Sequence, residues 1–284
     1  MKKTWIAMAA VAVLLLSACA QETDEAASPV PSGEDPCAVE NLPVMEPGTL
    51  TIATDSPAYP PWFEENDPTN GQGYEGAVAY AVADALGFGP EEVKWVVEPF
   101  NKSYAPGSKD FDFDINQISI TAKRANAVDF SDGYYDVNQA LIALKTSPVA
   151  GATTIAELVD AKLGAQVGTT SLAYIQENIQ PTQQPYVYDT TNDAKSALEA
   201  GQIDGIVVDL PTAFYITAVE IPKGKVVGQF PATGDPEQFG LLLEKDSPLL
   251  SCVNEAVAEL KSNGTLAQIQ QEWLADKVNA PVFS

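Results

Sequence analysis

The sequence predicts an α/β protein built on parallel β-sheets. Short runs rich in β-branched residues alternate with helix-forming runs along most of the 284 residues, which is the pattern that βαβ units produce. There are more of these units than one small sheet holds, and no period of 20–50 residues indicates a solenoid. Apolar residues make up 45% of the chain, which is enough for a folded core. We therefore expect one large or two medium-sized α/β domains.

The first half of the folded region supplies four candidate strands and one clear helix. Its strand-like runs are bounded by Gly, Pro, Asp or Ser, which are typical turn residues. Apolar residues at helical spacing run from Glu75 to Leu86, and Gly87 follows as a typical helix end. The expected strands cover residues 49–54, 93–97, 111–115 and 139–144.

A second β/α series begins near residue 163. Its first strand breaks at Gly168, and Thr169 then opens a helix as an N-cap residue. The expected strands cover residues 163–167, 186–188, 203–208 and 241–243. The expected helices cover residues 169–178, 191–200, 248–262 and 265–276.

The stretch from Phe111 to Arg124 combines a buried strand, a polar lip and a cation. Asn116 and Gln117 follow the strand, and Thr121 is a suitable N-cap for the helix that contains Arg124. Arg124 is the only arginine of the chain. Open α/β sheets bind ligands at the carboxyl ends of their strands, so a guanidinium there suggests an anionic partner. The alternative is a surface arginine that pairs with a nearby aspartate.

Composition excludes several classes of function. The net charge is −24, so nucleic acid and anionic membrane surfaces would repel the chain. Histidine is absent, which removes His-based catalytic triads, His metal sites and the usual general base. We expect no catalytic residue, no metal and no cofactor.

The N-terminus predicts export. Lys2 and Lys3 precede an apolar run over residues 5–16, which is short for a membrane span but suits a signal peptide. The Leu-Ser-Ala-Cys sequence that ends at Cys19 resembles the lipobox of bacterial lipoproteins. That resemblance implies that residues 1–18 are a lipoprotein signal peptide and that Cys19 carries the lipid anchor. A secretory signal with an ordinary cleavage site is the alternative.

A tether and a disulfide are expected next. Residues 19–43 begin with a polar, acidic, proline-bearing stretch, which predicts a disordered tether. With Cys19 taken by lipid, Cys37 and Cys252 remain in an oxidising compartment, where a disulfide is the natural outcome. Two free thiols are the alternative.

Seven motifs in order resemble one known family. They are ATDSPAYPPW, GYEGAVAYAVADALG, FDFDINQISITAKR, VDFSDGYYD, GAQVGTTS, GQIDGIVVDLPTAF and ELKSNGTLAQIQQEW. Together they resemble the family 3 extracellular solute-binding proteins, the amino-acid receptors of ABC importers. The resemblance implies a two-lobed periplasmic-binding-protein-like fold of type II, with two hinge strands near residues 140–145 and 238–243. Lobe one is expected at residues 44–142 plus 239–284, and lobe two at 143–238.

The resemblance also implies roles for individual residues. In the family, the arginine after SIT holds the ligand α-carboxylate and the aspartate that ends IVVD takes the α-ammonium, which are Arg124 and Asp209 here. The GTT turn at residues 168–170 offers backbone N–H groups to the same carboxylate, and helix N-termini do bind anions. Tyr59 and Phe100 fall on positions that sandwich the aliphatic stem. Without the resemblance, residues 168–170 would be interpreted as an ordinary capped helix start and Asp209 as a helix N-cap. Tyr59 and Phe100 would be interpreted as core aromatics.

The chain departs from the family pattern before the arginine. It carries Asn116-Gln117-Ile118-Ser119 where relatives carry Ser-Ser-x-Ser, so amides replace two hydroxyls. Asp55 and Glu75 match positions that contact the ligand side chain in some relatives and cap loops in others. The predicted ligand-binding set is Asp55, Tyr59, Trp62, Glu75, Phe100, Asn116, Gln117, Ser119, Arg124, Gly168, Thr169, Thr170 and Asp209.

The predicted function is capture of a polar amino acid and its delivery to the permease subunits of an ABC transporter. The protein is expected to be a monomer, anchored by lipid to the outer face of the cell membrane or in the periplasm. One alternative is a ligand-sensing receptor. The other is a dehydratase-like enzyme on the same fold, in which Glu75 or Asp209 would serve as the general acid.

Overall fold

The computed structural model describes residues 35–275 and 279–284. The predicted signal peptide, Cys19 and the first part of the tether lie outside the described residues. Within them, two five-stranded sheets and a two-stranded ribbon organise the fold. We call the half built on the first sheet the first lobe, and the half built on the second sheet the second lobe.

The first sheet has the strand order β2-β1-β3-β12-β4. Its strands are β1 (Leu50–Thr54), β2 (Val93–Val97), β3 (Phe113–Asp114), β4 (Asp129–Phe130) and β12 (Leu242–Leu243). Strand β1 pairs in parallel with β2 and β3, whereas β12 runs antiparallel to β3 and β4. Helices α1 (Tyr74–Ala85), α7 (Leu250–Ser262) and α8 (Thr265–Leu274) contribute to the largest hydrophobic core on this sheet.

The second sheet has the strand order β10-β6-β9-β7-β8. Its strands are β6 (Gln139–Leu144), β7 (Leu163–Gln166), β8 (Tyr186–Tyr188), β9 (Gly205–Asp209) and β10 (Gly224–Gln229). The helices around it are α4 (Thr170–Tyr174), η5 (Ile175–Ile179), α5 (Thr191–Glu199), α6 (Leu210–Tyr215) and η6 (Ile216–Glu220). Both faces are covered, because alternate residues of β6 and β9 enter two separate cores.

Short elements complete the chain. The helices α2 (Phe100–Ser103) and α3 (Ala122–Ala125) lie in the first lobe. The single-turn helices are η1 (Val39–Asn41), η2 (Pro68–Asn70), η3 (Pro90–Glu92) and η4 (Ile155–Leu158). The strand expected at residues 111–115 is confined to β3, since the chain turns into the polar lip directly afterwards.

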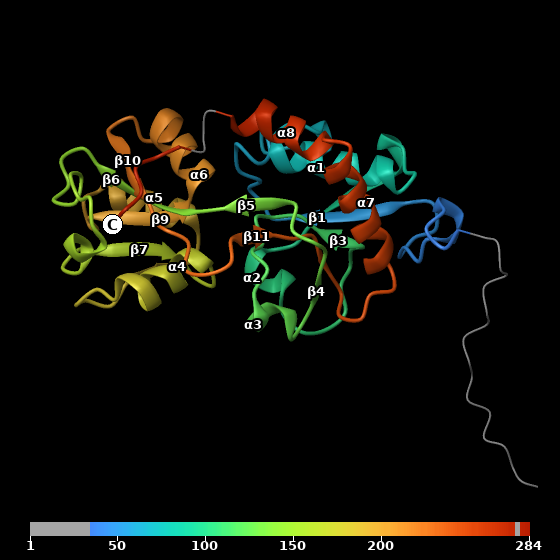
Figure 1. Cartoon of the computed structure of the whole chain (residues 1–284), viewed down its shortest axis with the longest axis horizontal. Helices are drawn as coiled ribbons and strands as arrows, with labels where there is room; N and C mark the ends of the chain where they lie inside the picture. Colours follow the sequence, from blue (N-terminus) through green and yellow to red (C-terminus); the bar gives the residue numbers. More distant parts are fainter. Residues whose placement is uncertain (1–34, 276–278) are drawn as a thin grey trace, which may run out of the picture. The chain divides into compact units, whose positions relative to one another are not determined.

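The two lobes are joined by the ribbon β5 (Tyr135–Val137) and β11 (Glu237–Phe239), which pair antiparallel between the two sheets (Figure 1). Strand β6 lies within the second sheet over its whole length, pairing with β10 and β9. The chain therefore first crosses from one lobe to the other at β5, a few residues before the hinge strand expected near residues 140–145. The lobe boundaries 44–142 plus 239–284 and 143–238 otherwise stay a prediction.

The end of the chain packs on the second lobe. The Gln229 N–H donates to the Pro281 carbonyl at 2.8 Å, and the Phe283 N–H donates back to the Gln229 carbonyl at 2.9 Å. Ala280 and Phe283 are buried in the two cores of the second sheet. The prediction that lobe one includes residues 239–284 missed this return to the second lobe, because so short a segment carries no periodic pattern.

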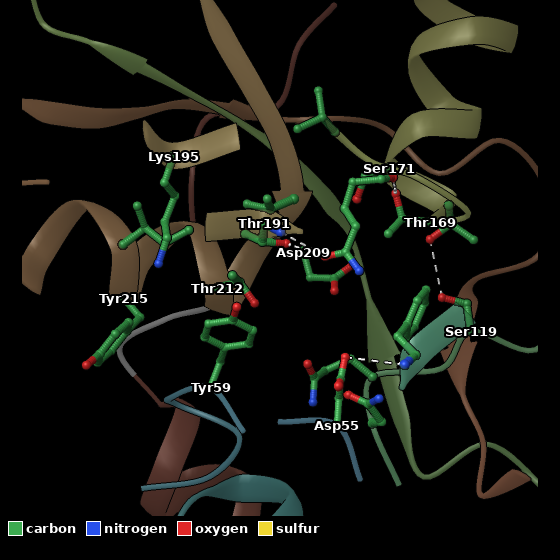
Figure 2. Close-up of a pocket in the computed structure, with 18 of the residues that line it drawn as sticks. Asp55, Tyr59, Ser119, Thr169, Ser171, Thr191, Lys195, Asp209, Thr212 and Tyr215 are labelled. Atoms are coloured by element: carbon green, nitrogen blue, oxygen red, sulfur yellow. Dashed lines mark hydrogen bonds between the residues drawn. The ribbon is translucent and has the colours of Figure 1, made fainter. Parts of the chain in front are cut away.

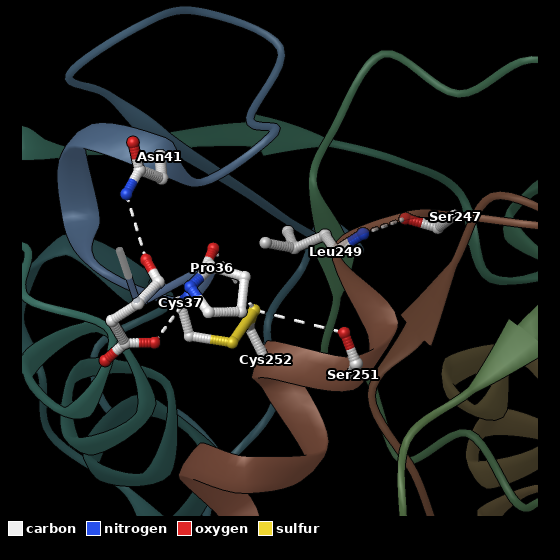
Figure 3. The surroundings of a disulfide bond; sticks show 8 residues. Pro36, Cys37, Asn41, Ser247, Leu249, Ser251 and Cys252 are labelled. Carbon is white, nitrogen blue, oxygen red and sulfur yellow. Dashed lines mark hydrogen bonds between the residues drawn. A yellow bond between two sulfur atoms is a disulfide. The ribbon is translucent and has the colours of Figure 1, made fainter. Parts of the chain in front are cut away.

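A disulfide joins Cys37 to Cys252, as predicted (Figure 3). It closes a sequence separation of 215 residues and ties the start of the described chain to α7, where Cys252 is only 4% exposed. None of the helices in the described ranges combines the length and the apolar character that a membrane span requires.

Candidate functional site

The carboxyl ends of the parallel strands of both sheets line one large pocket, of about 850 Å³ including its open mouth (Figure 2). This is where open α/β sheets bind ligands. Most of the predicted ligand-binding residues line it: Asp55, Tyr59, Phe100, Asn116, Gln117, Ser119, Arg124, Thr169, Thr170 and Asp209. Three lie beside it instead: Trp62, Glu75 and Gly168.

Arg124 is buried at the first-lobe side of the pocket, with 7% of its surface exposed. Thr121 caps α3 by accepting from the Arg124 N–H, as predicted. The guanidinium donates through Nη1 to the Ser119 carbonyl at 2.7 Å and through Nη2 to the Gly168 carbonyl at 3.0 Å. It also lies over the rings of Phe100 and Tyr104, with centroid distances of 5.4 and 4.7 Å. Among the described residues it forms no ion pair, which disfavours the alternative of a surface arginine paired to an aspartate.

Gly168 brings the second lobe close to Arg124. Its φ of +76° is a left-handed conformation that favours glycine. A Cβ at this position would lie 2.3 Å from the Tyr104 hydroxyl and 2.3 Å from the Asn101 side-chain oxygen. The next residue, Thr169, is the N-cap of α4 and accepts from the Leu172 N–H at 3.1 Å. Gly168 therefore supplies a close approach of the backbone, and its carbonyl faces the guanidinium.

Asp209 ends β9 and faces the pocket from the second lobe. It occupies the N-cap position of α6, but its side chain makes no capping hydrogen bond, so the N-cap alternative is not what the structure shows. Its carboxylate accepts from Gln139 Nε2 at 2.7 Å. Burial, with the nearby charge of Glu237, raises the pKa of Asp209 to about 8. Asp209 therefore holds its proton at neutral pH unless a cation enters the pocket.

Two residues that the sequence did not single out organise Asp209. Gln139 Nε2 also donates to Glu237 Oε2 at 3.2 Å, and its Oε1 accepts from the Ser171 hydroxyl. Glu237 accepts in turn from the Ser119 hydroxyl of the first lobe. Gln139 begins β6 and pairs with Asp209 of β9, whereas Glu237 begins the ribbon strand β11, so both contacts depend on pairing between distant segments, which no local pattern indicates.

Glu75 lies behind the pocket, not in its lining, and is fully buried. Its carboxylate accepts from the Gln117 N–H at 2.7 Å, from Gln117 Nε2 and from the Tyr134 hydroxyl. Burial raises the pKa of Glu75 to about 7, although these hydrogen bonds oppose the shift. Gln117 has a φ of +47°, an uncommon value for a residue with a side chain. Glu75 thus holds the polar lip in shape.

Asp55 lines the pocket but already has backbone partners. Its Oδ1 accepts from the Ser56 N–H at 2.7 Å, and its Oδ2 accepts from the Phe100 N–H at 3.3 Å. This geometry favours the loop-cap interpretation of Asp55 over direct selection of a cationic side chain. Asn116, in contrast, is buried with no hydrogen-bond partner for its Nδ2 among the described residues.

Trp62 and Tyr59 have different surroundings, although both come from the proline-rich loop. Trp62 is fully buried, packs edge-to-face on Tyr74, and donates its indole N–H to Thr212 of the second lobe at 2.8 Å. Tyr59 lines the pocket, and burial followed by the charge of Asp55 raises its pKa to about 12. Trp62 therefore contacts the other lobe, and Tyr59 faces the pocket.

The second lobe adds residues that the sequence did not predict. Lys195 of α5 and Glu220 of η6 form an ion pair at 2.8 Å on the pocket wall. The remaining unpredicted lining residues are Pro60, Gln166, Ser171, Thr191, Val207, Val208, Thr212, Tyr215 and Ile216. A lysine within a helix commonly lies on a solvated face, so only the packing of α5 reveals its place.

Comparison with known proteins confirms the resemblance. Residues 50–276 match the family model of the bacterial extracellular solute-binding proteins, family 3. The chain is 28% identical over 241 residues to the L-cystine-binding protein TcyJ of Escherichia coli K12, covering 83% of this chain and 86% of that protein. It is 26% identical over 272 residues to the ABC transporter glutamine-binding protein GlnH of Bacillus subtilis 168, covering 93% of this chain and 94% of that protein.

A solved structure agrees with the sequence comparison. An ancestral arginine-binding protein bound to arginine is 28% identical and superposes with a TM-score of 0.65, covering 80% of this chain and 98% of that one. The predicted two-lobed fold of type II is therefore confirmed.

Proposed function

We propose that this chain, which belongs to the bacterial extracellular solute-binding proteins of family 3, captures an amino acid in the interlobe pocket and delivers it to an ABC importer. One observation carries the proposal: a guanidinium and a carboxylate from opposite lobes, Arg124 and Asp209, line the same pocket. A rigid two-pronged donor suits a carboxylate, and an acceptor-only group suits an ammonium. Relatives that bind cystine, glutamine and arginine support an amino acid as the ligand.

The zwitterion would also join the lobes. Arg124 holds the α-carboxylate and Asp209 the α-ammonium, so each lobe alone offers half of the clamp. Such a ligand has higher affinity for the closed arrangement than for an open one, and this difference drives closure by hinge motion. Asn116, Gln117, Ser119, Thr169 and Thr170 line the pocket beside the clamp and supply further polar contacts.

A thermal-shift screen of free amino acids tests the proposal. Ligand that binds only the native state raises its stability by RT ln(1 + [L]/Kd), so a true ligand raises the melting temperature with its concentration. Arg124→Ala should abolish the shift, whereas Lys123→Ala, on the exposed neighbouring position, should retain it. If no amino acid stabilises the wild-type protein after removal of co-purified ligand, the proposal is wrong.

A dehydratase-like activity is the second candidate, because Asp209 combines a pocket position with a pKa of about 8. A protonated carboxyl of this kind can act as a general acid at neutral pH. Glu75 does not line the pocket, which leaves Asp209 as the acid. Mass spectrometry of the ligand after prolonged incubation separates the two functions: a binder returns it unchanged, and an enzyme converts it.

The setting of the protein completes the proposal. An exported monomer held by lipid at Cys19 would stay beside its transporter, since two acyl chains anchor a protein stably. The residues before the disulfide at Cys37 would then act as the tether. Mass spectrometry of the N-terminal peptide from cells tests this anchor, and light scattering of the purified protein tests the monomeric state. A sensor that reports to a membrane partner would bind the ligand equally well but would not support its uptake.

A further inference from the structure

The pocket contains a second pair of opposite charges. Lys195 is 9% exposed, although it lies on a helix whose neighbouring buried positions are Ala194, Ala197 and Leu198. Its Nζ lies 2.8 Å from both carboxylate oxygens of Glu220, and the same Nζ lies 5.4 Å from the centroid of the Tyr59 ring. A cation held this far from solvent on a pocket wall is unlike the usual exposed lysine of a helix surface.

This pair lies at the far end of the pocket from Arg124. Figure 2 shows Lys195 and Tyr215 at one end, Ser119 and Thr169 at the other, and Asp209 between them. Because the Arg124 guanidinium bonds to the Ser119 carbonyl, Ser119 marks the carboxylate end of the proposed clamp. A ligand whose first head group lies between Arg124 and Asp209 therefore extends its side chain towards Lys195 and Glu220.

We propose that the ligand is an amino acid with two α-amino-acid head groups, of the class to which cystine, cystathionine and diaminopimelate belong. This rests on the proposed function, since the first head group occupies the Arg124–Asp209 clamp. Lys195 binds the second carboxylate and Glu220 the second ammonium. An ammonium has three donors and a carboxylate about four acceptor sites, so the ion pair between these two residues leaves capacity for both ligand groups.

Other side chains match the far end less well. A cationic ligand side chain is attracted by Glu220 but repelled by Lys195. An anionic ligand side chain is attracted by Lys195 but repelled by Glu220. A neutral amide can accept from Lys195 and donate to Glu220, but it brings no charge to either contact. A second zwitterion presents an opposite charge to each residue, and charge-assisted hydrogen bonds are the stronger ones. Asp55, an acid that lines the pocket from the first lobe, already accepts from the backbone N–H groups of Ser56 and Phe100.

Further polar and aromatic side chains line the pocket. Gln166 uses its side-chain oxygen to accept from the Thr191 N–H and hydroxyl, at 2.9 Å each, which leaves its N–H₂ group as the donor end of a lining residue. Tyr59 and Tyr215 flank the Lys195 end of the pocket (Figure 2) and can cover an apolar linker between the two head groups.

Isothermal titration calorimetry tests the assignment with defined probes. The two-headed probes are L-cystine, L,L-cystathionine and meso-diaminopimelate, and the single-headed probes are L-glutamine, L-arginine and L-histidine. We expect at least one two-headed probe to bind about tenfold or more tightly than every single-headed one. Lys195→Met and Glu220→Gln should each weaken that probe by about tenfold to a hundredfold, the range for a lost charge-assisted contact. Each variant should change single-headed binding by about threefold or less.

Controls separate this role from a structural one. Lys245→Met removes a lysine–aspartate ion pair of 2.7 Å outside the pocket and should leave every affinity unchanged. Melting temperatures of all variants show whether they fold. If single-headed amino acids bind as tightly as two-headed ones, or if folded Lys195→Met and Glu220→Gln weaken both classes equally, the second head-group site is wrong while the amino-acid receptor stands. If no probe binds at all, the proposed function itself fails.

Discussion

Arg124 and Gly168 are joined across the two lobes by a hydrogen bond of 3.0 Å from the guanidinium to the carbonyl oxygen. The same guanidinium bonds to Ser119 within its own lobe at 2.7 Å. Arg124 thus links the first lobe to the turn that opens α4. Because Gly168 has no side chain, its backbone reaches a position beside Tyr104 that a Cβ would block.

The first prediction concerns Arg124→Lys, which keeps the charge but loses the planar fork. Amino-acid affinity should fall by about tenfold to a hundredfold, because one ammonium cannot hold a carboxylate bidentately and also satisfy two carbonyls. Calorimetry with the ligand found in the screen measures the loss. The burial of Arg124 and its two carbonyl partners also predict a loss of stability on the order of 1–2 kcal/mol. Wild-type affinity in folded Arg124→Ala would overturn the clamp.

The second prediction concerns the proton on Asp209. In the free protein its pKa is about 8, so the carboxyl is protonated at pH 6. A ligand ammonium favours the ionised form, and binding near pH 7 should therefore release a proton. Affinity should rise as the pH increases from 6 to 8, where less proton release is needed. Calorimetry in buffers of different ionisation enthalpy measures the released proton, and Asp209→Asn should abolish the release. Equal enthalpies in all buffers for the wild type would contradict this prediction.

The third prediction concerns Glu75 and the pH dependence of stability. Its folded pKa of about 7 lies above the ordinary value of 4.5, so the folded state binds more protons than the unfolded state between these values. Its contribution is complete below pH 4.5 and is lost as the pH rises through 7, by an amount on the order of 3 kcal/mol. Melting curves from pH 4.5 to 8 should therefore decline less for Glu75→Gln than for the wild type. Parallel curves would show that Glu75 does not titrate in this range.

The fourth prediction concerns Asp55→Asn. Both of its carboxylate oxygens accept backbone N–H groups, so its replacement should loosen the loop and weaken charged and neutral ligands by the same factor. Affinities for L-arginine and L-glutamine, measured side by side, check this expectation. A loss confined to the cationic ligand would instead make Asp55 a selector of side-chain charge.

The fifth prediction concerns the disulfide between Cys37 and Cys252. Reduction, or Cys37→Ser, should lower the free energy of unfolding by about 2–4 kcal/mol, mainly because the unfolded chain gains freedom. Thermal unfolding with and without reductant measures the difference, and the reductant should have no further effect on the variant. Recovery of Cys252 as a free thiol in non-reducing peptide mapping would contradict the bond.

Local sequence patterns were sufficient for features that depend on neighbouring residues. They predicted the longer strands and helices in order, the Thr121 cap, the Gly168 turn and the position of Arg124 after its strand, but not the strands β4, β5, β10 and β11. The alternation predicted two parallel β/α series, and the motif order added their arrangement in two lobes. These inferences were accurate because periodicity, capping and turn chemistry act over a few residues.

Which side chains face the pocket depends on how the helices and lobes pack together. Glu75 lies four residues ahead of Ala79 on the buried face of α1 and is directed at Gln117, while Lys195, on an ordinary helix, enters the pocket wall. Gln139 lies directly opposite Asp209 because β6 pairs with β9, and the β5–β11 ribbon brings Glu237 to the same place. The orientation of a helix on its sheet and the crossing of the chain between lobes are set by packing over long sequence separations, and no local pattern encodes them.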